Sequence, residues 1–328
     1  MLSDSIFRVA AIDIGTNSTR ILIADQVGAH CAESFNEIVR LTKITRLGQG
    51  VDRDKNINIP AMRRVSEALL EYSNLMNRMS VNRYFAVGTS ALRDAKNSDW
   101  FVEQIKLRTG IDVVIISGER EASFSFNGAT YDMDRDFKKN DTKSGIIGSR
   151  ILVFDVGGGS TEFTLGKGCS ILFFKSIDVG CVRVSERFLK SNPPAEHELA
   201  EMLSFIEKTI TGTINSIINT GVDIVIGTAG TATNLSAMNL GLIKYDPKKT
   251  HMSRVDLDFI HKQFKVLSCM TIDERRSVTG LEPARADIIV GGIAVMMKVL
   301  EMLGRNEMIV SEKDILDGIV LELLKSIS

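Results

Sequence analysis

A pattern of strand, glycine turn and strand occurs twice in this chain of 328 residues, and it constrains the fold more than any other feature. In the clearer copy, residues 151–166 (ILVFDVGGGSTEFTLG), an apolar run ends on Asp155, three glycines follow, and a second apolar run begins at Phe163. Residues 12–25 align with residues 154–167 so that Asp13 meets Asp155. Such a repeat predicts two related halves.

The residue types in the turn indicate a phosphate-binding site. Because glycine has no Cβ, the backbone can approach a ligand closely and direct several N–H groups at one point. Asp155 would repel a bare phosphate, so its position makes sense if a divalent cation, most commonly Mg²⁺, lies between them. Glu162 can bind the same ion through a water. For one isolated match an ordinary hairpin turn is the better explanation, but the repetition favours phosphate binding.

A second pair of segments supports the duplication. Residues 85–91 (FAVGTSA) and 225–230 (VIGTAG) both read as a strand, a Gly-Thr pair and the start of a helix. Each follows its own glycine turn at nearly the same spacing. We therefore expect two facing halves with a ligand in the cleft between them.

Composition excludes several classes of protein. Apolar residues make up 44% and charged residues 25%, as in globular proteins, and the length suits two domains. Forty basic and 41 acidic residues give a net charge of −1, which argues against a DNA-binding protein. Four scattered cysteines without a CxxC pair argue against zinc sites and disulfides. Neither a leader nor a membrane-spanning run is apparent, so we expect a cytoplasmic protein with no membrane partner.

Helices are expected in the remaining segments. Apolar spacing predicts one helix after Pro60 through about residue 79 and another from Pro193 to about residue 219. Further helices are expected to begin at Asp256, at Pro283 and at Ser311, the last with a sequence similar to a capping box. Gly291 and Gly292 within one of these helices indicate close helix packing or approach to a ligand, and residues 132–150 read as a surface loop.

Two further segments carry side chains that are candidates for chemistry. In residues 115–122 a strand end runs into a helix that carries Glu119, Arg120 and Glu121, and a carboxylate beside a bound polyanion suits a general base. A plain helix start is the alternative, since acidic residues favour that end. Arg93, after the first Gly-Thr pair, can clamp phosphate oxygens or can be an exposed helical arginine.

Six segments together resemble the exopolyphosphatase / guanosine pentaphosphate phosphohydrolase (Ppx/GppA) family of the sugar kinase–actin–Hsp70 superfamily. They are AAIDIGTNSTRILIAD, VGTSALRDAKN, ISGEREASFSFNGA, VFDVGGGSTEFTLG, VIGTAGTATNLSAM and DERRSVTGLEPARADIIVGGIAVM. The resemblance implies an α/β fold of two ribonuclease-H-like domains around a central cleft. The first domain would be residues 1–125 and the second residues 126–310, with the helix at about residues 311–328 packing back on the first.

The same resemblance implies hydrolysis of a terminal phosphoanhydride in inorganic polyphosphate or pppGpp, dependent on Mg²⁺ or Mn²⁺. Glu121 would activate the attacking water, and Arg93 would grip the terminal phosphate. The implied metal ligands are Asp13, Asp155 and Glu162. The implied phosphate-binding residues are Thr16, Asn17, Ser18, Gly157, Gly158, Gly159, Ser160 and Thr161. The expected ligands are polyphosphate and guanosine penta- or tetraphosphate, and a homodimer remains open.

Longer members of the family carry an additional C-terminal helical region with an HD-like domain, whereas this chain stops at Ser328. We therefore expect the short two-domain form, with short polyphosphate or pppGpp favoured over processive degradation of long chains. Two alternatives remain. One is a kinase of the same superfamily that binds ATP through residues 227–234, and the other is a non-catalytic sensor that binds pppGpp.

Overall fold

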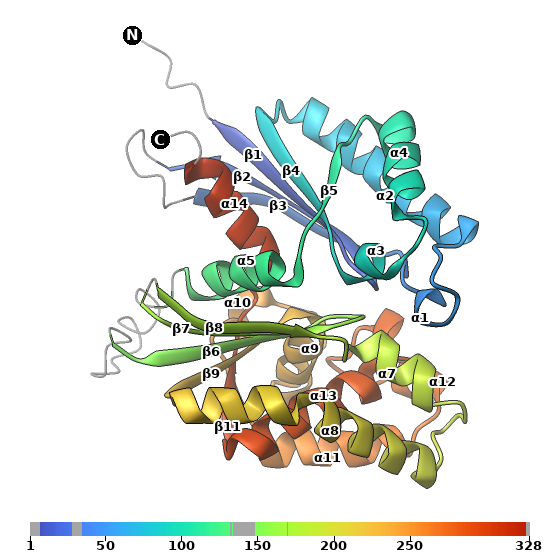
Figure 1. The fold of residues 1–328 in the computed structure, drawn as a ribbon, viewed down its shortest axis with the longest axis vertical. Coiled ribbons are helices and arrows are strands. Elements are labelled where there is room, and N and C mark those ends of the chain that lie inside the picture. Colours follow the sequence, from blue (N-terminus) through green and yellow to red (C-terminus); the bar gives the residue numbers. More distant parts are fainter. Residues whose placement is uncertain (1–6, 28–34, 132, 134–147, 169, 326–328) are drawn as a thin grey trace. The chain divides into compact units, whose positions relative to one another are not determined.

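The computed structural model describes residues 7–27, 35–131, 133, 148–168 and 170–325, so most of the predicted loop at 132–150 lies outside the described residues. The chain divides into two compact units (Figure 1). Unit 1 comprises Met1–Gly128 and Ile315–Ser328, and unit 2 comprises Ala129–Asp314. Among the described residues, no helix is long and apolar enough to cross a membrane.

Unit 1 contains a five-stranded mixed sheet. Its strand order is β3 (Phe35–Ile44), β2 (Ser18–Gln26), β1 (Arg8–Ile14), β4 (Arg83–Gly88) and β5 (Val113–Ile115). The first three strands pair antiparallel, whereas β1, β4 and β5 are parallel. The carboxyl ends of these three strands therefore meet at one edge of the sheet, where α/β proteins commonly bind their ligands.

Both faces of this sheet are covered by helices, which is why β1 is apolar at nearly every position. Ala10, Ile12 and Ile14 pack in a core with α2 (Ile59–Arg78) and α4 (Ser98–Thr109), seen together in Figure 1. Val9 and Ala11 face the opposite core, which contains α14 (Ile315–Lys325) and part of α5 (Gly118–Thr130). Two short helices, α1 (Val51–Asp54) and α3 (Ser90–Asp94), complete the unit.

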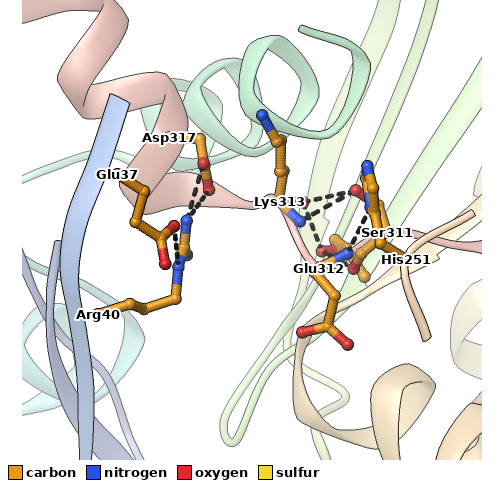
Figure 2. Close-up of polar contacts among 8 residues, drawn as sticks. Glu37, Arg40, His251, Ser311, Glu312, Lys313 and Asp317 are labelled. Carbon is orange, nitrogen blue, oxygen red and sulfur yellow. Dashed lines mark hydrogen bonds and ion pairs between the residues drawn. The ribbon is translucent and has the colours of Figure 1, made fainter. Parts of the chain in front are cut away.

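Besides its apolar packing, the C-terminal helix α14 makes an ion pair and a close backbone contact within unit 1. Asp317, fully buried, accepts hydrogen bonds from Nη2 of Arg40 at 2.8 Å and 2.9 Å, and the same guanidinium reaches Glu37 (Figure 2). At Gly318 a Cβ atom would lie 2.0 Å from the carbonyl oxygen of Phe124, so only glycine permits this approach to α5. The last helix thus supports the helix that carries Glu121.

The prediction that this helix begins at Ser311 is wrong, because α14 begins at Ile315. The N–H of Ser311 donates to Gly227, which continues the pairing of β11 (Glu307–Val310) with β9. Its hydroxyl donates to the carbonyl of Lys313, as Figure 2 shows, instead of capping a helix. Sheet pairing across the chain therefore overrides the local capping sequence.

Unit 2 repeats the topology of unit 1 with one strand added. Its order is β8 (Ser170–Ile177), β7 (Thr161–Lys167), β6 (Arg150–Val156), β9 (Ile224–Thr228), β11 (Glu307–Val310) and β10 (Arg254–Asp256). Again a hairpin precedes a run of parallel strands, β6, β9 and β11. The two Gly-Thr pairs noted in the sequence end the equivalent strands β4 and β9.

The helices of both units test the remaining predictions. Helices α2, α8 (Glu196–Thr220) and α11 (Leu257–Ser268) are confirmed, and Asp256 caps α11 by accepting from Phe259 N–H at 2.6 Å. Pro283 opens only a 3₁₀ turn, η1 (Pro283–Arg285), and α13 (Ile289–Leu303) begins later, so that predicted start is wrong. The others are α7 (Cys181–Phe188), α9 (Ala229–Asn239), α10 (Pro247–Thr250) and α12 (Ile272–Arg275).

The paired glycines of α13 serve helix packing. A Cβ at Gly291 would lie 2.4 Å from Oγ of Ser185 on α7, and one at Gly292 would lie 2.4 Å from Oγ1 of Thr231 on α9. Because both α7 and α9 approach the backbone of α13 this closely, the first of the two predicted explanations, close helix packing, holds.

Candidate functional site

The two glycine turns have the same geometry. In unit 1 the N–H of Gly15 donates to the carbonyl of Ser18 at 2.9 Å, and in unit 2 the N–H of Gly157 donates to that of Ser160 at 3.0 Å. Each turn lies at the carboxyl end of the first strand of its sheet, β1 or β6. The repeat seen in the sequence is thus a repeat in structure.

In unit 2, the start of α7 binds the carbonyl oxygens of the turn. The N–H groups of Cys181 and Val182 donate to Gly157 and Gly158, both at 2.9 Å. Nε of Arg183 donates to the carbonyl of Gly159 at 2.7 Å. Gly180 permits this approach, since a Cβ there would lie 2.4 Å from the carbonyl oxygen of Gly158.

These bonds determine where the N–H groups of the turn point. In a planar trans peptide the C=O and the following N–H point in opposite directions. The N–H groups of Gly158, Gly159 and Ser160 therefore face away from α7, and none of them has a hydrogen-bond partner among the described residues. Three successive unpaired N–H groups form an anion-binding concavity.

The turn of unit 1 is held in a similar way by the segment after β3. The N–H of Gly48 donates to the carbonyl of Thr16 at 2.9 Å, and the N–H groups of Thr45 and Arg46 donate to that of Asn17 at 3.0 Å and 2.8 Å. Asn17 is only 5% exposed, and its Nδ2 has no partner within the part of the chain that the structure describes. A buried amide donor without a partner is costly unless a ligand accepts from it.

The hydroxyl groups of the turns have different partners. Thr161, fully buried, donates its hydroxyl to the carbonyl of Val179, and the equivalent Thr19 bonds to Thr45 at 2.9 Å. These two threonines hold the hairpins in place. Ser160 and Ser18 are therefore the hydroxyl residues of the turns that are better placed to donate to a ligand.

Two acidic side chains of unit 2 are neighbours across its hairpin. Asp155 on β6 pairs in register with Glu162 on β7, and both are buried. Ser176 donates to Oε1 of Glu162 at 2.7 Å, which orients that carboxylate. Paired buried carboxylates repel each other unless a cation or a proton is shared. The described residues hold no group of three or more His, Cys, Asp or Glu ligands, so substrate oxygens and water would complete the coordination, as is common for Mg²⁺.

The equivalent position in unit 1 holds an arginine. Arg20 pairs in register with Asp13, and its Nε and Nη2 donate to Oδ2 of Asp13 at 3.0 Å and 2.7 Å. The positive charge that a metal would supply beside Asp155 is thus supplied beside Asp13 by a side chain. This ion pair weakens the case for Asp13 as a metal ligand and leaves that for Asp155 and Glu162 intact.

Arg93 and Glu121 are brought together in unit 1. Nη1 of Arg93 lies 2.6 Å from Oε2 of Glu121 and also donates to the carbonyl of Ile116 at 3.0 Å. Arg93 follows β4 and Glu121 follows β5, so both lie at the edge of the sheet that carries the turn after β1. A neighbouring guanidinium favours the ionised carboxylate, which is the form that can accept a proton.

The two residues before Glu121 have structural roles. Hydrogen bonds from its own backbone N–H and from the Ser117 hydroxyl hold the pKa of Glu119 below its ordinary value, as for an acidic residue at a helix start. The guanidinium of Arg120 lies 5.3 Å from the ring centroids of both Phe85 and Phe124. Glu121 is thus the acidic residue of this segment that remains for chemistry.

Sequence reasoning missed two arginines of the site, Arg20 and Arg183. Arg20 could have been found, because the alignment of the two copies matches it with Glu162, and each residue pairs with the aspartate of its own hairpin. Arg183 carries no local signal, since it reaches the turn only through the packing of α7.

The model of the Ppx/GppA phosphatase family matches residues 22–327, and the chain belongs to this family. Exopolyphosphatase 2 of Mycobacterium tuberculosis is 36% identical over 326 residues, which cover 96% of this chain and 98% of that protein. Guanosine-5'-triphosphate,3'-diphosphate pyrophosphatase of Vibrio atlanticus is 27% identical over 315 residues, 96% of this chain and 59% of that protein.

The crystal structure of an exopolyphosphatase-like protein superposes with a TM-score of 0.89 at 30% identity, covering 99% of both chains. Together with the two mixed sheets, these matches confirm the predicted family and the predicted two-domain α/β fold.

Proposed function

We propose that this protein hydrolyses phosphoanhydrides and releases the terminal orthophosphate of inorganic polyphosphate, of pppGpp, or of both. The observation that carries the proposal is the hairpin turn of unit 2, whose carbonyl groups are bonded to α7 and whose N–H groups at residues 158–160 are left for an anion, together with the turn of the same geometry in unit 1. Two relatives are named an exopolyphosphatase and a pppGpp pyrophosphatase, and both names support a phosphoanhydride as the bond that is hydrolysed.

The hairpins would bind the phosphate chain. The backbone N–H groups of residues 158–160 and the side chains of Asn17 and Ser18 are the donors we assign to phosphate oxygens, with Thr16 contributing through its backbone. Phosphoryl transfer spreads negative charge over several oxygens. It is therefore promoted by fixed donors more than by covalent chemistry.

Glu121 is the residue we assign as general base. Its carboxylate would accept a proton from the attacking water while the bond between the terminal phosphorus and the bridging oxygen breaks. The released chain leaves with that oxygen. Arg93 would hold the Glu121 carboxylate in place and attract the oxygens of the terminal phosphate.

Asp155 and Glu162 are the residues we assign to a divalent cation, Mg²⁺ or Mn²⁺, directly or through water. When bound, the cation supplies positive charge that offsets the charge of the phosphate oxygens. Asp13 was predicted to take part as well, but Arg20 already neutralises its carboxylate. We therefore assign Asp13 to the structure of the hairpin.

Orthophosphate release by the purified protein with Mg²⁺ tests the proposal. Short polyphosphate, long polyphosphate and pppGpp should be compared side by side, with Glu121→Gln as the variant. We expect Glu121→Gln to lower kcat by about 10²- to 10⁴-fold, the usual contribution of a general base. Glu119→Gln is the matched control, because it removes a carboxylate of the same helical turn that serves the helix start.

Three results would contradict the proposal in different ways. Normal activity of Glu121→Gln would show that the base is another group. ATP consumption that requires an acceptor, without release from polyphosphate or pppGpp, would favour a kinase. Tight pppGpp binding with no phosphate release would favour a sensor.

A further inference from the structure

Arg183 contacts the turn of unit 2 from the side opposite the unpaired N–H groups. Its own N–H donates to the carbonyl of Gly158 at 3.1 Å, and its Nε donates to that of Gly159 at 2.7 Å. The side chain is only 10% exposed, although it carries a positive charge.

The consequence for the turn follows from peptide geometry. The carbonyl of Gly159 and the N–H of Ser160 belong to one planar trans peptide and point in opposite directions. Backbone donors of α7 hold the carbonyls of Gly157 and Gly158, whereas the carbonyl of Gly159 is held by a side chain. Because glycine adopts many backbone conformations, this peptide could rotate if the guanidinium were removed.

The positive charge of Arg183, like its hydrogen bond, favours binding of an anion to the turn. Its Nη2 lies 3.8 Å from Oδ1 of Asp178, but Asp178 is 76% exposed, so water screens much of that carboxylate. The guanidinium's own contribution to the potential at an anion on the other side of the turn is positive.

We propose that Arg183 is a positioning residue that orients the N–H of Ser160 towards the phosphate chain and raises the affinity of the turn for phosphate. The inference rests on the proposed function of this hairpin as a phosphate-binding turn. A purely structural role would instead make Arg183 an anchor of α7, with an effect on stability and none on affinity.

Affinity for tripolyphosphate separates the two roles. Binding should be measured by calorimetry in a Glu121→Gln background, which prevents turnover, and KM and kcat should be measured with short polyphosphate in the active protein. The variants are Arg183→Met and Arg183→Lys. The control is Arg187→Met, on the same helix, whose guanidinium lies 4.3 Å from the ring centroid of Phe205.

Loss of one charge-assisted hydrogen bond should raise Kd and KM of Arg183→Met about tenfold. Arg183→Lys, which keeps the charge, should recover part of the affinity, and kcat should change by less than KM. Arg187→Met should leave Kd and KM at wild-type values even if it lowers Tm.

Equal Kd values for Arg183→Met and Arg187→Met would overturn the inference. If Arg183→Met does not fold, Arg183→Lys decides: a wild-type Kd for that variant together with a lowered Tm would assign a structural role. Failure of the hydrolase proposal is distinguishable, because it would appear as tripolyphosphate binding by the wild-type protein without phosphate release from any substrate.

Discussion

Nη1 of Arg93 lies 2.6 Å from Oε2 of Glu121, although the two residues belong to different helices of unit 1. The same Nη1 donates to the carbonyl of Ile116, so the guanidinium is held by two partners before any substrate binds. Its position is therefore set by the ends of β4 and β5, and Glu121 is oriented by a charged group that cannot lose its proton at ordinary pH.

Replacing Arg93 should therefore reduce catalysis. We expect Arg93→Met to lower kcat by about 10²-fold or more, the loss typical of removing one positioned donor to a transition state. Arg93→Lys should recover little, since an ammonium lacks the planar fork with which a guanidinium can contact the carboxylate and phosphate oxygens at the same time. Orthophosphate release measures both.

Arg120→Met is the control for that comparison. It also removes a guanidinium from unit 1, but one that lies over the rings of Phe85 and Phe124. Arg120→Met should lower Tm, and its kcat should fall much less than that of Arg93→Met. A similar fall of kcat in Arg93→Met and Arg120→Met would contradict a role specific to Arg93.

The two hairpins should respond differently to metal. Asp155→Asn and Glu162→Gln should each raise the Mg²⁺ concentration for half-maximal activity by about tenfold, the equivalent of 1.4 kcal/mol of lost binding. Binding of Mn²⁺ measured by electron paramagnetic resonance should weaken in parallel. Asp13→Asn should leave the metal requirement unchanged, because Asp13 pairs with Arg20. A shift as large as that of Asp155→Asn would restore Asp13 as a ligand.

Removal of Asp317 should destabilise unit 1. The carboxylate is almost fully buried and bonded twice by Arg40, so Asp317→Ala removes the buried half of this ion pair and should cost about 3–5 kcal/mol in free energy of unfolding. Urea denaturation measures it. Glu37→Ala removes the other carboxylate that Arg40 bonds, which is 46% exposed, and should cost less than about 1 kcal/mol. Equal losses would show that burial of the pair is unimportant.

Acidification should reveal the contribution of Glu198 to stability. The backbone N–H of Ala195 holds the pKa of Glu198 below its ordinary value, burial opposes this shift, and the N–H groups of Lys190 and Ser191 add to it. The folded state therefore binds this proton less readily than the unfolded state. The contribution of Glu198 to the free energy of unfolding is therefore fully present above the ordinary glutamate pKa. It is lost as the pH falls through the pKa that Glu198 has in the folded protein.

Glu198→Gln provides the comparison. The difference in Tm between the wild-type protein and this variant should shrink as pH falls from about 7 to about 3. A constant difference over this range would show that the hydrogen bonds of Glu198 do not depend on its charge.

Local patterns predicted the two hairpins of the candidate site and several helices of the fold around it. The two hairpins, helices α2, α8 and α11 and the cap at Asp256 follow from residues within one or two turns of each other. The predicted starts at Pro283 and Ser311 were wrong, and the second fails because of a distant contact. Ser311 bonds to Gly227 in the neighbouring strand, and α13 begins only after η1 ends.

The sequence alone determined that the chain contains a repeated glycine turn with an acid at the end of each first strand, and six segments that include both turns sufficed to identify its family. Only the tertiary structure decided which groups of each turn remain available to a ligand. That choice depends on hydrogen bonds from α7 and from residues 45–48, which reach the turns through packing of separate segments. It also separated Asp13, paired with Arg20, from Asp155, which faces Glu162, because cross-strand register determines which side chains meet.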